Sequence, residues 1–348
     1  MSAVIPARPD LAAAVERSPG VWKAAWQRLR HDRVGTVSLA IVCAFMLLIL
    51  AATLGLVAGD WQRETGVPYA PPTISGADRA QAEQAIEAPK GPLVDLSDVD
   101  PLAPRYAEWK DRAAKFQSTE IVKATTLAFG GDRLGRDVLV KAIKGAQVSI
   151  FVGLSAALLA TLIGTVLGAA GGYIGGKVGD FLEWVYNVFT SIPDILLIFA
   201  FAAVFGRGIE TVVLILGLAG WTGMYRQVRA EYIKHRTREY VRAAEAIGVS
   251  HAARMFIHIL PNVSHVILVR LSLLVVGFIK AEVILSFLGL GVPVDQVSWG
   301  TMLAEANVEL VLGKWWQLAA ATAFMATFVT AFSLLTDALR DALDPKLR

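Results

Sequence analysis

Six long apolar stretches constrain this chain more than any other feature. A helix needs about 20 apolar residues to cross the roughly 30 Å hydrocarbon core of a bilayer. Three of the stretches are 22 or 23 residues long without a charge, and charged residues make up only 18% of the chain, against about 25% in soluble domains. The sequence therefore predicts an all-α integral membrane protein with six transmembrane helices, at 37–58, 148–170, 185–206, 211–225, 263–291 and 315–336.

Basic residues are distributed unevenly around these stretches and predict the orientation. The N-terminal segment 1–36 carries five Lys or Arg between positions 17 and 33, and the 226–262 loop carries seven against three Glu. The tail, 337–348, carries three more. Short segments rich in Lys and Arg stay in the cytoplasm, whereas long loops cross the membrane regardless of charge. Both termini and the 226–262 loop are thus expected in the cytoplasm, with the insert 59–147 outside and a core at 148–336.

The insert differs from the rest of the chain in composition. Seven of the fourteen prolines lie between Pro68 and Pro104, which favours turns and extended segments. Short helices are expected at 81–88 and 105–123. Too few apolar residues recur regularly for a separate core, so we expect a cap on the membrane domain, with a disordered linker as the alternative.

Several motifs point away from enzymatic chemistry. Residues 171–177, GGYIGGK, nearly match a phosphate-binding loop, but Val178 cannot bind Mg²⁺ and the run follows a predicted span instead of a strand. Gly164, Gly168 and Gly172 instead form a small-xxx-small stripe for close helix packing. His251, His258 and His265 are seven apart, too far for a helical metal site, and the net charge of +3 does not suggest nucleic-acid binding. No catalytic residue and no metal site is expected.

The 226–262 loop is much longer than a connection requires. Residues 237–247 have apolar positions at helical spacing, and Gly248 is placed to end that helix in a left-handed cap. Ser250 can cap a second helix at 252–259, before Pro261 and the next span. The pattern suits a docking element for a cytoplasmic partner, or an amphipathic pair resting on lipid headgroups.

Motifs in this loop and beyond it resemble a known family. Arg242-Ala243-Ala244-x-x-x-Gly248, followed by Leu260-Pro261, resembles the E-A-A-x-x-x-G-(x)9-I-x-L-P loop of importer-type ABC permeases. Arg242 replaces Glu and His258 replaces Ile, both usual in the oligopeptide and dipeptide branch, which other stretches resemble. They are GGDRLGRDVLVKAIKGAQVS (130–149), EYVRAAEAIGVS (239–250), HILPN (258–262), AEVILSFLGLGV (281–292), SWGTMLAEA (298–306) and DALRDALDPKLR (337–348).

The resemblance implies the ABC importer type I permease arrangement, in a second-permease subunit of a bacterial inner-membrane peptide importer. Implied partners are a homologous second permease, two cytoplasmic ATP-binding subunits that use ATP and Mg²⁺, and an extracytoplasmic peptide-binding protein. This chain would bind no cofactor itself. The insert is longer than usual, and nickel, glutathione or a microcin-like peptide remain alternative solutes. The residues implied in coupling to the ATPase are Glu239, Tyr240, Arg242, Ala243, Ala244, Glu245, Gly248, Leu260 and Pro261.

Charges inside the predicted spans are candidates for the translocation path or its gating, since such groups usually face protein or a water-filled cavity. They are Asp194, Lys280 and Glu282. Lys280 and Glu282 point about 200° apart on a helix, so we expect Glu282 to bond a neighbouring helix, and Arg270 to snorkel to the cytoplasmic face. The rival class, an ion-coupled secondary transporter, would show an inverted repeat with interrupted helices. Pro193-Asp194 offers one interruption without a matching segment.

Overall fold

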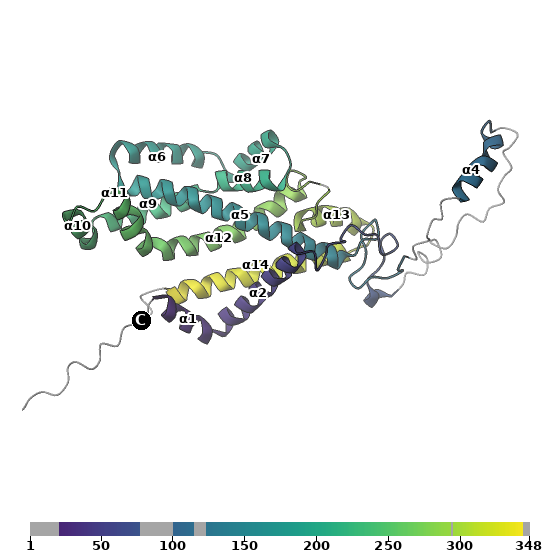
Figure 1. Cartoon of the computed structure of the whole chain (residues 1–348), viewed down its shortest axis with the longest axis horizontal. Coiled ribbons are helices and arrows are strands. Elements are labelled where there is room, and N and C mark those ends of the chain that lie inside the picture. The colour runs from purple at the N-terminus through teal and green to yellow at the C-terminus, as the bar shows by residue number, and fades with distance from the viewer. Residues whose placement is uncertain (1–20, 77–99, 115–122, 294, 344–348) are drawn as a thin grey trace, which may run out of the picture.

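The computed structural model describes residues 21–76, 100–114, 123–293 and 295–343, and all of these except 100–114 belong to an elongated, mainly helical bundle (Figure 1). These residues contain no β-strand, only four isolated β-bridges before or at the start of the second long helix. The prediction of an all-α fold is confirmed. The predicted helix at 81–88 lies outside the described residues, while 105–123 contains a shorter helix, α4 (Tyr106–Ala114).

Four helices are long, and three of them are apolar enough to cross a bilayer. α2 (Arg33–Thr53), α5 (Val138–Tyr173) and α14 (Trp316–Leu343) meet both criteria within the described residues. α12 (Leu260–Phe287) is equally long but carries three charges. A fourth candidate span exists if one bent pair of helices is counted as one. The shorter elements are α1 (Val21–His31), η1 (Thr73–Ser75), η2 (Ala103–Arg105), α10 (Glu239–Ala246), α11 (His251–Ala253), the π-helix η3 (Arg254–Ile259) and α13 (Trp299–Val311).

Two of the predicted spans are not continuous helices. The segment 185–206 is divided between α6 (Gly176–Thr190) and α7 (Asp194–Phe205), which meet at 84°. Pro193 stands at the break, because proline lacks an N–H and disfavours helical geometry in the residue before it.

The segment 211–225 likewise divides, into α8 (Ile209–Ala219) and α9 (Thr222–Arg236). Gly220 lies at this break, with the Phe278 ring where its side chain would be: a Cβ there would lie 2.3 Å from the ring. The interruption at Pro193-Asp194 was expected from the sequence, whereas the prediction of one unbroken helix at 211–225 is wrong.

The boundaries of the insert also differ from the prediction. α2 ends at Thr53, five residues before the predicted end of the first span. α5 begins at Val138, ten residues before the predicted start of the second, because the Asp137 carboxylate caps the backbone N–H groups of Leu139 and Val140. At 1.5 Å per residue, α5 is about 54 Å long and exceeds the hydrocarbon thickness.

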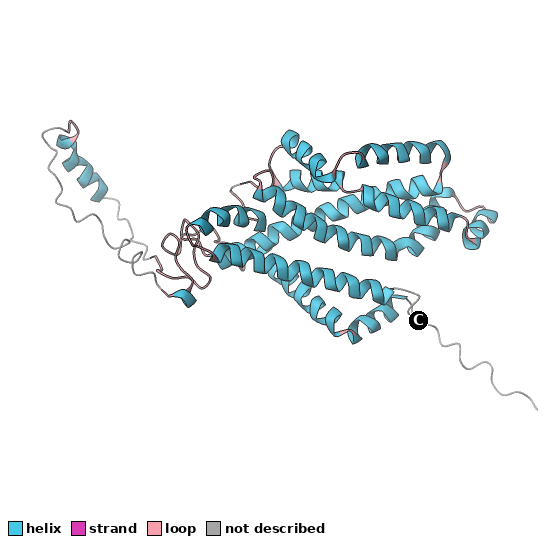
Figure 2. Cartoon of the chain, turned by 180° about the vertical axis from the view of Figure 1, so that it is seen from behind, coloured by secondary structure: helices cyan, strands magenta, loops and turns pink. Residues whose placement is uncertain are grey.

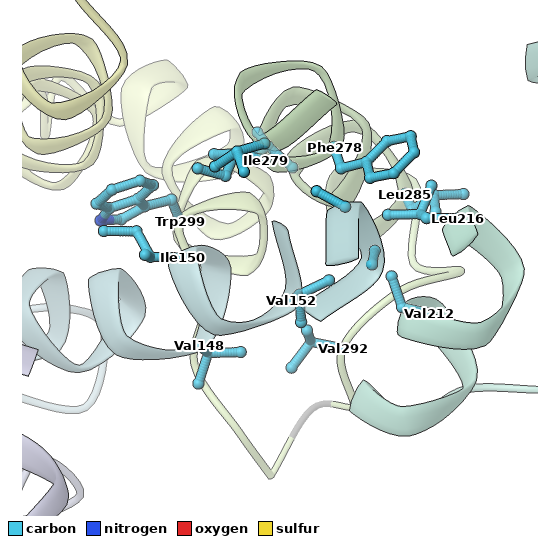
Figure 3. Packing of buried hydrophobic residues seen from close by; sticks show 14 of the residues in the cluster. Val148, Ile150, Val152, Val212, Leu216, Phe278, Ile279, Leu285, Val292 and Trp299 are labelled. Atoms are coloured by element: carbon cyan, nitrogen blue, oxygen red, sulfur yellow. The ribbon is translucent and has the colours of Figure 1, made fainter. Parts of the chain in front are cut away.

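α5 is the central helix, and small residues bring other backbones against it. A Cβ on Gly168 would lie 2.8 Å from the Tyr225 carbonyl of α9, and one on Gly172 would lie 2.5 Å from the Arg229 carbonyl. Gly164 meets Trp221 in the same way, so the predicted small-residue stripe is confirmed. Further along, α5 joins α8, α12 and α13 in one apolar core, whose side chains interdigitate in Figure 3.

The two ends of the bundle are built from different parts of the chain. Figures 1 and 2 show α1, the end of α14 and α10 at one end. The Arg28 guanidinium donates to the Ala342 carbonyl at 3.2 Å and joins α1 to α14 there. The other end holds α13 and the segments 54–76 and 123–137, the two ends of the insert. Those segments are bridged to each other and pack on Trp316.

The contact between α5 and α9 generates a stability prediction. Gly168→Leu forces a side chain into the α9 backbone, and we expect it to destabilise the fold by about 1–3 kcal/mol or more. The measurement is the thermal unfolding midpoint in mild detergent. Gly277→Leu in α12 is the matched control, because nothing lies within 4 Å of that Cβ position. An equal midpoint shift for both variants would contradict this packing.

Candidate functional site

The 226–262 loop contains a short amphipathic helix, as predicted. α10 buries Val241 and Ala244 and leaves its other face exposed. Val241 packs in a cluster with Tyr232, Met255 and Ile259, drawn from α9 and η3. One apolar face of α10 is thus packed against other described elements of the chain.

Gly248 ends α10 with the geometry that the sequence predicts. Its φ is +80°, and no atom lies within 4 Å of where a Cβ would be. The Gly248 N–H donates to the Glu245 carbonyl, and the Val249 N–H donates to the Ala244 carbonyl, both at 3.0 Å. This pair of bonds is a Schellman motif. A side chain would have room at this position. Glycine is favoured because of the positive φ of the backbone and not because of crowding.

The second half of the loop continues directly into α12. Ser250 caps α11 by accepting from the Ala253 N–H at 3.3 Å, as predicted. The π-helix η3 then connects α11 to α12 without a non-helical residue between them. Pro261 does not interrupt this run, because it lies in the first turn of α12, where a missing N–H costs little. Residues 251–287 therefore form one helical rod that reaches from the loop into the bundle.

Ionic contacts connect this loop to the end of α5. Arg254 pairs with Glu245 of α10 at 2.7 Å, and its hydrogen bond holds the pKa of that carboxyl below the ordinary value. Arg254 also bonds His251, whose ring bonds the Tyr173 hydroxyl at 3.2 Å. Arg236 donates to the Tyr173 carbonyl at 3.0 Å. These residues line a cavity of about 690 Å³ between α10 and the bundle.

The structure gathers most of the predicted loop residues on α10 and its cap. Tyr240, Arg242, Ala243 and Glu245 are exposed, and Ile247 is 81% exposed. Arg242 has no ion-pair or hydrogen-bond partner among the described residues. Ala244 is buried on the opposite face of the helix.

The remaining predicted loop residues lie at the two ends of this element. Glu239 occupies the first turn of α10, where it complements the helix dipole. Leu260 and Pro261 begin α12, and the Tyr240 hydroxyl is hydrogen-bonded to the His235 ring of α9 at 2.8 Å. The predicted residues thus lie within one continuous segment, 239–261, in which Ala244 is buried.

The charges in the predicted spans do not come together. Glu282 is completely buried and accepts a hydrogen bond from Ser286 of the same helix at 2.7 Å. Ser149 of α5 and Ser298, the N-cap of α13, also lie beside this carboxyl group, so contacts with neighbouring helices accompany the i+4 bond. Lys280 is exposed on the opposite face of α12, and Asp194 is exposed at the start of α7. Arg270 does not snorkel freely: its guanidinium lies against Gly223 of α9.

Residues 141–348 match the family described as binding-protein-dependent transport system inner membrane component. This match covers α5 through α14 and therefore includes the loop and all the spans after the insert. The chain belongs to this family. Its region of similarity begins where the insert ends, so α2 and the insert lie outside the family match.

Individual permeases are similar over a slightly longer stretch. The chain is 37% identical over 220 residues to the oligopeptide transport system permease protein OppC of Bacillus subtilis, covering 63% of this chain and 72% of that protein. It is 38% identical to the dipeptide transport system permease protein DppC of the same organism, covering 63% and 69%. It is 40% identical to the glutathione transport system permease protein GsiD of Salmonella typhimurium, covering 63% and 72%.

A buried ionic network at the other end of the permease was missed by sequence reasoning. Lys141 of α5 is 1% exposed and bonds Asp132 at 2.7 Å and Glu305 of α13 at 2.6 Å. Gln317 of α14 donates to Glu305 at 2.9 Å. The network thus ties the end of the insert to three helices. The available signal was a pair of lysines, Lys141 and Lys144, in the otherwise mostly apolar start of α5.

Glu309 of α13 borders this network and is only 2% exposed. One of its oxygens accepts from the Arg133 N–H at 3.3 Å, and the other is buried without a partner. The pKa of Glu309 is raised to about 7, chiefly by burial; Lys141 opposes the shift, and the nearby carboxylates of Glu305 and Asp132 contribute to it. A carboxyl group with a raised pKa binds its proton more tightly in the folded state than in the unfolded state.

Stability should therefore depend on pH through Glu309. Because its folded pKa is raised, the folded state loses stability as pH rises from about 4.5 to about 7. Glu309→Gln should change the thermal midpoint little at pH 5 and raise it above the wild type at pH 8. Glu108→Gln, on the exposed surface of α4, is the control and should change neither value. A Glu309→Gln effect of the same size at both pH values would contradict this assignment.

Proposed function

We propose that this chain is the permease subunit of an ABC transporter that imports peptides across the bacterial inner membrane. The observation that carries the proposal is the 226–262 loop: an exposed short helix, a glycine cap and a helical rod that enters α12. The similarity to oligopeptide, dipeptide and glutathione transport permeases supports a peptide substrate, since glutathione is itself a tripeptide.

Six spans form the membrane domain in this proposal. α2, α5, α12 and α14 each cross once, the bent pair α6 and α7 forms one broken span, and α8 with α9 forms another. An even number of crossings agrees with α1 and the end of α14 lying at the same end of the bundle (Figure 1). The basic flanks assign that end, with α10, to the cytoplasm.

α10 would dock on a cytoplasmic ATP-binding subunit through its exposed face. Tyr240 and Ile247 offer an aromatic ring and an apolar side chain on one side of this exposed surface, and Arg242, unpaired among the described residues, offers a cation on the other side. A displacement of α10 would reach the bundle by two routes, through η3 into α12 and through Arg254 to the end of α5. ATP and Mg²⁺ would be used only by the ATP-binding subunits, and this chain would hydrolyse nothing.

The remaining partners follow from the same arrangement. A homologous second permease would supply the other half of the translocation path. The layer formed by 54–76, 123–137 and α13 would lie outside the membrane, where a peptide-binding protein delivers its cargo. The packed ends of the insert favour a cap over a linker, because Ala70 and Val138 are completely buried in this layer. Reconstituted uptake of labelled oligopeptides, with both ATP-binding subunits and the binding protein present, tests the proposal.

Gly248 provides the sharpest test of coupling. A side chain at φ near +80° costs about 1–2 kcal/mol, and most for a β-branched residue. Gly248→Val should insert normally but reduce peptide uptake at least tenfold, with ATP hydrolysis no longer stimulated by the binding protein. Gly248→Asn is the matched control, because Asn tolerates this backbone region, and it should retain most of the uptake. Wild-type uptake by the Val variant at normal expression would rule out this role.

The orientation is tested separately, by labelling single cysteines in a Cys43→Ser background. Ala107→Cys on α4 should react with an impermeant thiol reagent in spheroplasts, whose inner membrane is intact. Lys234→Cys, on the exposed surface of α9, should react only after the membrane is opened. Labelling of the second variant in closed spheroplasts would overturn the six-span arrangement.

A further inference from the structure

One exposed face of α12 carries two cations and no acid. At about 100° per residue, its members fall within an arc of about 80°. Leu273, Gly277, Lys280, Ile284 and Leu288 are exposed, and Arg270 is half-buried on the same face. Neither Lys280 nor Arg270 forms an ion pair or a hydrogen bond with any residue that the structure describes. We call this face the cationic stripe.

The acid of this helix does not neutralise the stripe. Glu282 points about 200° away from Lys280 and is buried. Ser286 satisfies one of its oxygens at 2.7 Å. The two cations therefore lack a counter-ion on their own helix and, among the described residues, on the rest of the chain, so an anionic ligand could neutralise them.

Both cations lie at the depth of the bilayer in the six-span arrangement. Gln147 of α5 donates to Thr53 at the end of α2, which marks one edge of the spans. Gly153, six residues or about 9 Å further along α5, packs against Ile279, the neighbour of Lys280. Arg270 lies ten residues, or about 15 Å, further toward the loop end. Charges at such depths usually face protein or a water-filled cavity and are functional.

The surroundings of the two cations leave room for a ligand. No atom lies within 4 Å of the Cβ position of Gly277, one turn before Lys280, so the stripe has a notch there. Arg270 lies against Gly223 of α9, and its Nε is buried without a partner. A ligand on this stripe would thus meet one exposed ammonium group and one preoriented guanidinium group.

We propose that the cationic stripe lines the translocation path and binds the carboxylate of the transported peptide, first at Lys280 and then at Arg270. This inference rests on the proposed function. The terminal carboxylate is the one anionic group that all linear peptides share, whatever their side chains. Charge-assisted hydrogen bonds to a carboxylate are strong in a site of low dielectric constant.

Accessibility tests whether the stripe faces water. Lys280→Cys in a Cys43→Ser background, assembled with its partner subunits in proteoliposomes, should react with the anionic reagent methanethiosulfonate ethylsulfonate. Peptide delivered by the binding protein should slow this reaction. Leu47→Cys, exposed on α2 and assigned to lipid, should not react. An unreactive Lys280→Cys would mean that the stripe faces lipid or the second permease, and would overturn the proposal.

Transport tests the carboxylate directly. We expect Lys280→Gln to reduce uptake of a peptide with a free C-terminus at least tenfold and uptake of its C-terminal amide less than twofold. Lys280→Arg should restore uptake of the free acid. An equal loss for both peptides would indicate an acid of the second permease as the counter-ion, and an unchanged rate would indicate no role; either overturns the proposal.

Two further outcomes separate this inference from the proposed function. A wild-type complex that takes up neither peptide refutes the proposed function itself. If the wild-type complex takes up the free acid but not the amide, the reaction of Lys280→Cys with the thiol reagent decides. A slower reaction in the presence of the free acid supports carboxylate binding at the cationic stripe, and an unchanged reaction overturns it.

Discussion

Direct contact between the backbones of α5 and α9 fixes the geometry on which the other parts depend. Three glycines one turn apart leave no side chains between these helices, so the α9 carbonyls lie where Cβ atoms of α5 would be. Without a hydrophobic driving force between helices in lipid, this kind of close van der Waals packing holds helices together. It sets the direction in which α9 leaves the bundle, and hence where the 226–262 loop begins. Tyr173 then meets that loop at the end of the same α5 surface.

Local patterns in the sequence were sufficient to predict those features that depend on residues close together in the chain. Gly248 and Ser250 act as caps through hydrogen bonds between residues three to five apart, and both were predicted. The proline itself indicated the break at Pro193, whereas nothing singled out Gly220, because hydropathy continues across it while α8 ends. Pro261 was expected to end a helix, but a proline in the first turn of a helix is compatible with a continuous rod.

Contacts between distant segments could not be predicted in this way. Lys141 pairs with Glu305, 164 residues further along the chain, and no spacing rule links them. The opposite faces of Lys280 and Glu282 followed from helical periodicity. Periodicity could not tell which of the two would be buried, because that depends on α5 and α13 packing against one side of α12.

The length of α5 has a mechanical consequence. Lys141, near its first turn, anchors the buried ionic network, and Tyr173, its last residue, receives Arg236 and His251 from the loop. These two anchors are 32 residues apart, about 48 Å of unbroken helix. An α-helix resists stretching and compression. A displacement of one anchor along the helix axis therefore also displaces the other anchor, unless the helix bends. The buried ionic network at one end of the bundle and the loop contacts at the other end are consequently connected by one rigid helix.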